Sequence, residues 1–209
     1  MSTLDKIALM QNRRDEIPNQ ELARTLAETK DTEGIHEIAV NLWNKNQNIQ
    51  SDCLKVLYEI GYIDPGLITE YVGDFLKLLL NKNNRMVWGS MIAISTIAHL
   101  RAGEIDAQRP LILKIIEGGS VITVDNGVKI LAVIASQLPV RSPEIFPYLL
   151  NHLETVLSKQ VPQHAEKIMV AVNTTNKDAF IEVLEKRMPD LTGSQVSRVN
   201  KVIKEAKKR

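Results

Sequence analysis

SMIAISTIA, residues 90–98, recurs in physical type at three other places in the chain: CLKVLYEIG at 53–61, GVKILAVIA at 127–135 and AEKIMVAVN at 165–173. The copies begin 37, 37 and 38 residues apart. Their first residue is always small (Cys53, Ser90, Gly127, Ala165) and their fifth is always large and apolar (Leu57, Ile94, Leu131, Met169). The ninth is small in three copies, and Asn173 is the exception. Because these positions share one helix face, the pattern predicts four helices whose small residues let a neighbouring helix pack closely.

A second amphipathic segment follows each of these helices, at 64–82, 104–119, 142–157 and 177–188. In the first of them the apolar residues Ile68, Val72, Phe75, Leu76 and Leu79 form one stripe. Residues 19–30 and 31–46 fit the same pairing upstream, and 192–206 form a last helix. A period in the high thirties with one helical hairpin per repeat is typical of an α-solenoid.

We therefore predict a single repeat domain over 1–209. It comprises an N-terminal helix or cap at 1–17, about five helical repeats over 18–190, and a basic capping helix at 191–209. The last helix carries six basic residues against Glu205 in RVNKVIKEAKKR, residues 198–209. Basic side chains suit a helix C-terminus, where they face the negative end of the helix dipole.

The segment RMVWGSMIAISTIA, residues 85–98, resembles the second helix of HEAT repeats, in which a basic residue precedes a small, large-apolar, small pattern. Residues 18–190, about five repeats, are similar to HEAT and armadillo-type repeat proteins. This resemblance implies an all-α fold, an α-solenoid built as a superhelix of antiparallel helix pairs. It says little about function, because these repeats serve many functions.

Composition excludes several classes of protein. The 209 residues carry 26 basic and 25 acidic side chains, so no overall field favours nucleic acid or an anionic membrane. A single cysteine, Cys53, rules out an intramolecular disulfide. The start has no apolar signal region, and no apolar run approaches the roughly 20 residues of a membrane span. We expect a soluble, cytoplasmic protein without membrane contact.

The sequence contains no recognisable catalytic motif. There is no phosphate-binding Gly-rich loop, no Gly-x-Ser-x-Gly elbow and no His-Glu-x-x-His pair. The four histidines are scattered, and Cys53 belongs to the small column, where a buried thiol is expected. We predict no enzyme activity, no cofactor and no metal site.

In HEAT proteins the second helix of each pair lines the concave face, and the resemblance implies the same here. Residues two before the large column point about 200° away from the core. With Arg85, opposite the core, and Trp88, on the flank, they form the predicted partner-binding set: Lys55, Arg85, Trp88, Ile92, Lys129 and Lys167. Trp88 and Ile92, one turn apart, form the predicted apolar anchor. Alternatively, Trp88 packs between repeats and the lysines only confer solubility.

The leading hypothesis is a non-catalytic scaffold whose groove binds a protein or peptide, with the cations favouring an acidic partner. The alternative is a nucleic-acid-binding protein related to the HEAT-like alkylpurine DNA glycosylases. In those enzymes an aromatic residue and a carboxylate lie one turn apart on an inner helix. Here Trp88 matches the aromatic, but Ile92 stands where Asp is expected, and Asp125 lies a repeat later. Under this alternative we expect the protein to bind nucleic acid without glycosylase activity.

Overall fold

The computed structural model describes residues 2–209, and in this range it contains helices and no strand. The chain divides into two compact units, Met1–Asn126 and Gly127–Arg209, here called unit 1 and unit 2. Each unit is a stack of helix pairs, so the predicted all-α solenoid fold is confirmed. No single helix in 2–209 has the length and apolar composition of a membrane span, although the bent pair Val121–Gln137 and Pro139–Thr155 meets both criteria when taken together.

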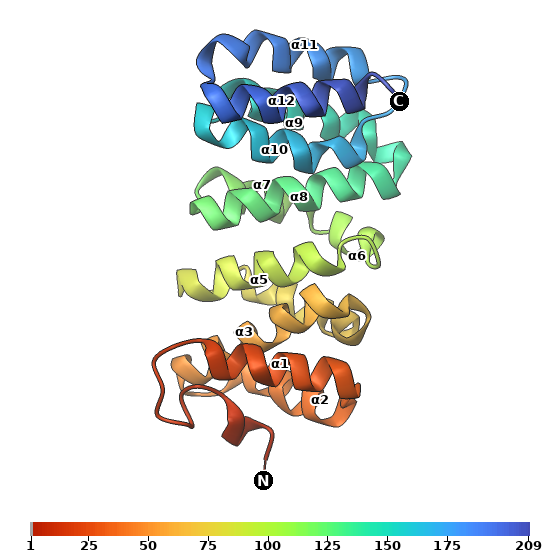
Figure 1. Cartoon of the computed structure of the whole chain (residues 1–209). Coiled ribbons are helices and arrows are strands. Elements are labelled where there is room, and N and C mark those ends of the chain that lie inside the picture. Colours follow the sequence, from red (N-terminus) through yellow and green to blue (C-terminus); the bar gives the residue numbers. More distant parts are fainter. Residues whose placement is uncertain (1) are drawn as a thin grey trace. The chain divides into compact units, whose positions relative to one another are not determined.

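Unit 1 holds the first three repeats. Its α-helices are α1 (Ile17–Thr29), α2 (Thr32–Val40), α3 (Gln47–Ile63), α4 (Val72–Leu78), α5 (Asn84–Ile97), α6 (Ala102–Asp106) and α7 (Arg109–Glu117), and α8 (Val121–Gln137) begins in it. A 3-10 helix, Pro65–Tyr71, precedes α4. Helices α1, α3 and α5 pack side by side, with α3 in the middle, and their starts lie at the same end of the unit (Figure 1).

The same turn starts α3 and α5. In Asn44-Lys45-Asn46 the Asn44 side chain accepts from the Asn46 amide at 2.9 Å, and the Asn46 side chain caps the helix. Residues 81–83 repeat the sequence and the turn 37 positions later, with distances of 2.8 and 3.0 Å. Asparagine is among the preferred N-cap residues because its side chain satisfies an amide that the helix leaves unpaired. The repeat period is thus visible in the turns as well as in the core.

The core of unit 1 follows the predicted columns. Cys53, Leu57, Ser90 and Ile94 are all fully buried between α3 and α5. The close approach is clearest at Gly61, where a β-carbon would lie 2.3 Å from Thr96 Oγ1 and 2.8 Å from Ile68 Cδ1. The small residue is therefore needed for the spacing of the two helices.

The N-terminal segment, residues 2–16, is a cap but not an α-helix. It contains one 3-10 turn, Leu4–Lys6, and otherwise turns and bends. The fully buried Ile7 anchors it, and the amide of Ala8 donates to Asn19 Oδ1 of α1 at 2.8 Å. The amide of Leu9 donates to Asp52 Oδ2 of α3, also at 2.8 Å. Tertiary hydrogen bonds replace those that a helix would have supplied.

Unit 2 contains the end of α8 together with α9 (Ser142–Thr155), α10 (Val161–Ile168), α11 (Lys177–Arg187) and α12 (Gly193–Ala206). Helix α9 packs with α11, and α10 packs with α12. Helix α12 is the predicted last helix and starts with a capping box between Thr192 and Gln195. Its basic Arg198 holds it to α10 through two bonds to the Glu166 carboxylate, at 2.8 and 2.7 Å.

The fourth copy of the repeat departs from the predicted register. Helix α10 ends at Ile168, and the chain continues as a 3-10 turn, Met169–Ala171. Met169, predicted as the buried centre, is only half-buried, and Ile168 takes the fully buried place. Ile168 follows Leu131 by 37 residues, so the spacing of the first three copies continues to Ile168 and not to Met169.

Candidate functional site

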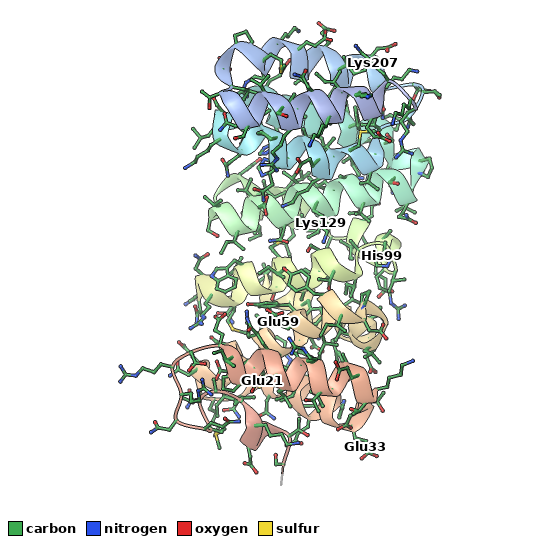
Figure 2. All side chains as sticks on the ribbon, in the orientation of Figure 1. Glu21, Glu33, Glu59, His99, Lys129 and Lys207 are labelled. Atoms are coloured by element: carbon green, nitrogen blue, oxygen red, sulfur yellow. The ribbon has the colours of Figure 1, made fainter. Side chains whose placement is uncertain are left out.

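Two of the predicted cations meet at one carboxylate in unit 1. Lys55 Nζ of α3 lies 2.8 Å from Glu16 Oε2, and Arg85 Nη2 of α5 lies 3.3 Å from Glu16 Oε1. Lys55 also pairs with Glu59 Oε1 at 2.7 Å, one turn along the same helix; Figure 2 labels Glu59. The Lys55 side chain is only 11% exposed, whereas that of Arg85 is 53% exposed. The prediction of an open Lys55 is wrong, because two carboxylates of the chain cover its ammonium.

Electrostatics keep this cluster ionised. The hydrogen bond from Lys55 lowers the pKa of Glu16 most strongly, and the nearby charge of Arg85 lowers it further. Burial acts on Lys55 in the opposite sense and lowers its pKa, but the hydrogen bonds to Glu16 and Glu59 outweigh burial and raise the pKa above its usual value. Both shifts favour the ionised form, so the Glu16 carboxylate and the Lys55 ammonium are both charged at neutral pH.

A row of three aromatic rings lies beside the ion cluster. The half-buried Trp88 of α5 has its ring centroid 6.4 Å from that of Tyr58 on α3. Tyr62, one turn further along α3, meets Tyr58 edge-on at 6.2 Å and is 56% exposed. The ammonium of Lys55 lies 4.9 Å from the Tyr58 ring centroid, within cation–π range. The rings thus present apolar surface next to paired charges, and Trp88 is neither fully exposed nor fully packed between repeats.

The predicted pairing of Trp88 with an exposed Ile92 is wrong. Ile92 is only 7% exposed. On the neighbouring turn of α5, Ser95 Oγ donates to Asn126 Oδ1 of α8 at 3.0 Å. Ile92 and Ser95 are three residues apart and so share a helix face. The apolar partner of Trp88 is therefore Tyr58, not Ile92.

Two cavities adjoin the ion cluster, and Glu16 and Arg85 line both. The smaller, of about 10 Å³, reaches Tyr58, Trp88 and Gly89. The larger, of about 320 Å³, is lined by polar side chains of the N-terminal segment and of the start of α3: Arg13, Arg14, Asp15, Asn48 and Asp52. The Glu16–Arg85 pair thus lies on the border between an aromatic and a polar cavity.

The remaining predicted residues, Lys129 on α8 and Lys167 on α10, lie in unit 2. Both are half-buried, and both take part in polar or electrostatic interactions. Of the six predicted residues, the structure brings together Lys55, Arg85 and Trp88.

Sequence reasoning missed Glu16, Tyr58 and Tyr62. The tyrosines had a signal, since they are one turn apart and follow Lys55 on the same helix. Glu16 had none, because Arg85 lies 69 residues away from it in the chain.

Nothing in the described range suggests metal or thiol chemistry. Within residues 2–209 no group of three His, Cys, Asp or Glu side chains is placed to hold a metal ion. Burial raises the pKa of Cys53 to about 12, which keeps the thiol protonated and unreactive.

No protein-family model and no curated protein matches the chain. Solved structures do match. An engineered protein superposes with a TM-score of 0.68 at 19% identity, and the match covers 100% of this chain and 98% of the engineered protein. A designed armadillo repeat protein in complex with the peptide (KR)4 gives 0.66 at 14% identity, covering 90% and 85%. Computationally designed armadillo repeat proteins for modular peptide recognition give 0.67 at 13% identity, covering 97% and 98%. The chain has the armadillo/HEAT-like helical repeat fold.

Proposed function

We propose that this armadillo/HEAT-like protein is a non-catalytic scaffold that binds an acidic segment of a partner protein on the face formed by α3 and α5. One observation carries the proposal. Lys55 and Arg85, from neighbouring helices, converge on a single carboxylate beside the partly exposed ring of Trp88. Arginine and tryptophan are enriched among the residues that contribute most to protein interfaces. The peptide complex of one structural neighbour agrees with a peptide as ligand.

The charge of the site favours protein over nucleic acid. Lys55 and Arg85 are balanced by Glu16 and Glu59, and the whole chain has a formal net charge of +1. Binding along a phosphate backbone needs several uncompensated cations, whereas Lys55 and Arg85 are both paired with carboxylates of the chain. A short acidic peptide needs only one or two cationic contacts together with an apolar one, which is what the geometry provides.

The chain supplies its own reporter for the test. It has two tryptophans, and replacing Trp43 of the 3-10 turn Asn41–Trp43 by Phe leaves Trp88 as the only tryptophan, whose emission can be excited selectively over that of the tyrosines. We would titrate the Trp43→Phe protein with a pool of decapeptides in which Glu or Asp alternates with apolar residues. A matched pool carries Gln and Asn in their place. The acidic pool is expected to change the Trp88 emission, and the amide pool is not.

The role of Arg85 is tested with a matched arginine. Arg85→Gln should weaken binding of the acidic pool about tenfold, because it removes a charged contact at the centre of the site. Arg24→Gln, an exposed arginine of α1, should leave it unchanged. Equal binding of both pools, or equal effects of the two substitutions, would contradict the proposal. A DNA duplex that binds tightly and loses affinity in Arg85→Gln would support the nucleic-acid alternative instead.

A further inference from the structure

Glu16 already makes the contacts that the proposed function assigns to a partner carboxylate. It is the N-cap residue of α1, and each of its carboxylate oxygens faces a different cation, Oε2 towards Lys55 of α3 and Oε1 towards Arg85 of α5. Carboxylates held in this way by two cations from different elements form charge-assisted hydrogen bonds. The structure therefore shows the two cations in a carboxylate-bound state, with a residue of the same chain as the bound group.

The Glu16 side chain lies at the border of the two cavities. Glu16 and Arg85 are the residues that the aromatic cavity at Trp88 and the polar cavity at Arg14 have in common. The aromatic cavity has room for only about 10 Å³ and the polar cavity for about 320 Å³, so the space beside the rings is narrow while the polar side can hold a ligand group. If the Glu16 side chain turned away, the open polar cavity would extend to the rings of Trp88 and Tyr58.

The backbone of Glu16 is fixed, so only the side chain is available for such a movement. The preceding segment is held by the buried Ile7 and by the hydrogen bonds of Ala8 and Leu9, and α1 packs against α3. The Glu16 side chain itself is 43% exposed. Because a partner carboxylate would form the same ion pairs with Lys55 and Arg85, exchanging one carboxylate for another has little net cost.

Lys55 does not lose its charge partner when Glu16 leaves. Its bond to Glu59, at 2.7 Å, lies within α3 and does not involve the N-terminal segment. Removing the only partner of a largely buried ammonium would be costly, but here the second carboxylate remains. The cluster is thus built so that one of its two carboxylates is replaceable.

We infer that Glu16 is a built-in competitor: its carboxylate occupies the subsite on Lys55 and Arg85 that an acidic side chain of the partner protein takes over. This inference rests on the proposed function and explains how the site would select ligands that carry a carboxylate. An acidic ligand replaces Glu16, which opens the path to Trp88. A ligand without a carboxylate leaves the Glu16–Arg85 pair in place and the aromatic cavity closed.

The test compares Glu16→Gln with Glu21→Gln, both in the Trp43→Phe background. Glu21 is an exposed carboxylate of α1, labelled in Figure 2, so the control makes the same change in net charge. The probes are the acidic and the amide decapeptide pools described above, and Trp88 emission is the readout. Glu16→Gln should bind the acidic pool about five- to tenfold more tightly than the parent, and Glu21→Gln should bind it like the parent.

The outcomes separate the inference from the proposed function. If the parent binds the acidic pool and Glu16→Gln binds it equally or more weakly, Glu16 is not a competitor, while the proposed function stands. If Glu16→Gln and Glu21→Gln gain affinity for the acidic pool equally, the gain comes from the change in net charge alone, and the inference is again wrong. If neither the parent nor Glu16→Gln binds either pool, the proposed function fails and the inference fails with it.

Discussion

Arg187 is the side chain whose loss should destabilise unit 2 most clearly. It lies on α11 with its side chain 11% exposed, and its guanidinium donates to the carbonyl oxygens of Leu153, Glu154 and Val156. The bonds to Glu154 and Val156 are both 2.9 Å long. These carbonyls end α9, where a helix has no amides of its own to pair them. Nε also bonds Asp190 Oδ2 at 2.9 Å. The Arg187 side chain of α11 therefore caps the C-terminal carbonyls of α9.

The magnitude follows from the partners that Arg187→Met would leave behind. A hydrogen bond from a charged donor contributes about 1.5–3 kcal/mol, and a buried carbonyl without a partner costs about 1–3 kcal/mol. These terms are not additive, and the variant also regains the cost of burying the guanidinium. Methionine keeps most of the apolar length, so no large cavity forms. We expect a loss of about 3–5 kcal/mol in the free energy of unfolding.

Urea unfolding followed by far-UV circular dichroism would measure the loss, and hydrogen exchange of residues 150–156 would locate it. Lys186→Met is the matched control. Lys186 is an exposed neighbour whose ammonium pairs with Glu182 at the surface, so its loss should cost less than about 0.5 kcal/mol. If the free energies of unfolding of Arg187→Met and Lys186→Met differ by less than about 1 kcal/mol, Arg187 does not stabilise α9 as a cap.

Two further predictions concern packing and pH. Gly61→Ala should destabilise the protein by about 1–2 kcal/mol, because the new methyl group meets Thr96 Oγ1. At Gly73 no atom lies within 4 Å of an added β-carbon, so Gly73→Ala should leave the stability unchanged or raise it. Thermal unfolding would measure both variants. His152 shares a 2.8 Å hydrogen bond with His164, and burial, followed by the charge of that neighbour, lowers the pKa of His152 from 6.5 to about 4. The folded state then binds fewer protons than the unfolded state between these values, so stability should fall by about 1–2 kcal/mol as pH drops from 6.5 to 4, after allowance for partial exposure. His152→Gln should flatten this part of the urea-midpoint profile, and an unchanged profile would refute the assignment.

The helical register was predictable because it depends on short stretches of chain. The columns that begin at Cys53 and Ser90 are buried as predicted, with Leu57 and Ile94 at their centres. An amphipathic pattern needs only a few turns of sequence to define a face, and four copies at one period reinforce one another. Met169 was misplaced because the fourth copy was aligned 38 residues after the third, whereas the 37-residue period from Leu131 leads to Ile168, the residue that is buried.

The candidate site was only partly predictable, because charge pairs and coverage arise between distant segments. The sequence placed Lys55, Arg85 and Trp88 on the face of α3 and α5 that does not point into the core. It could not show that Ile92 is buried, since helix geometry describes one helix and not the segments that pack against it.

The sequence by itself thus determined the repeat period and the buried faces of α3 and α5, because hydrophobic periodicity is local. Only the tertiary structure decided that Glu16 sits between Lys55 and Arg85. That contact joins residues 69 positions apart, and it exists because the N-terminal cap and the packing of α1 on α3 and of α3 on α5 bring them together.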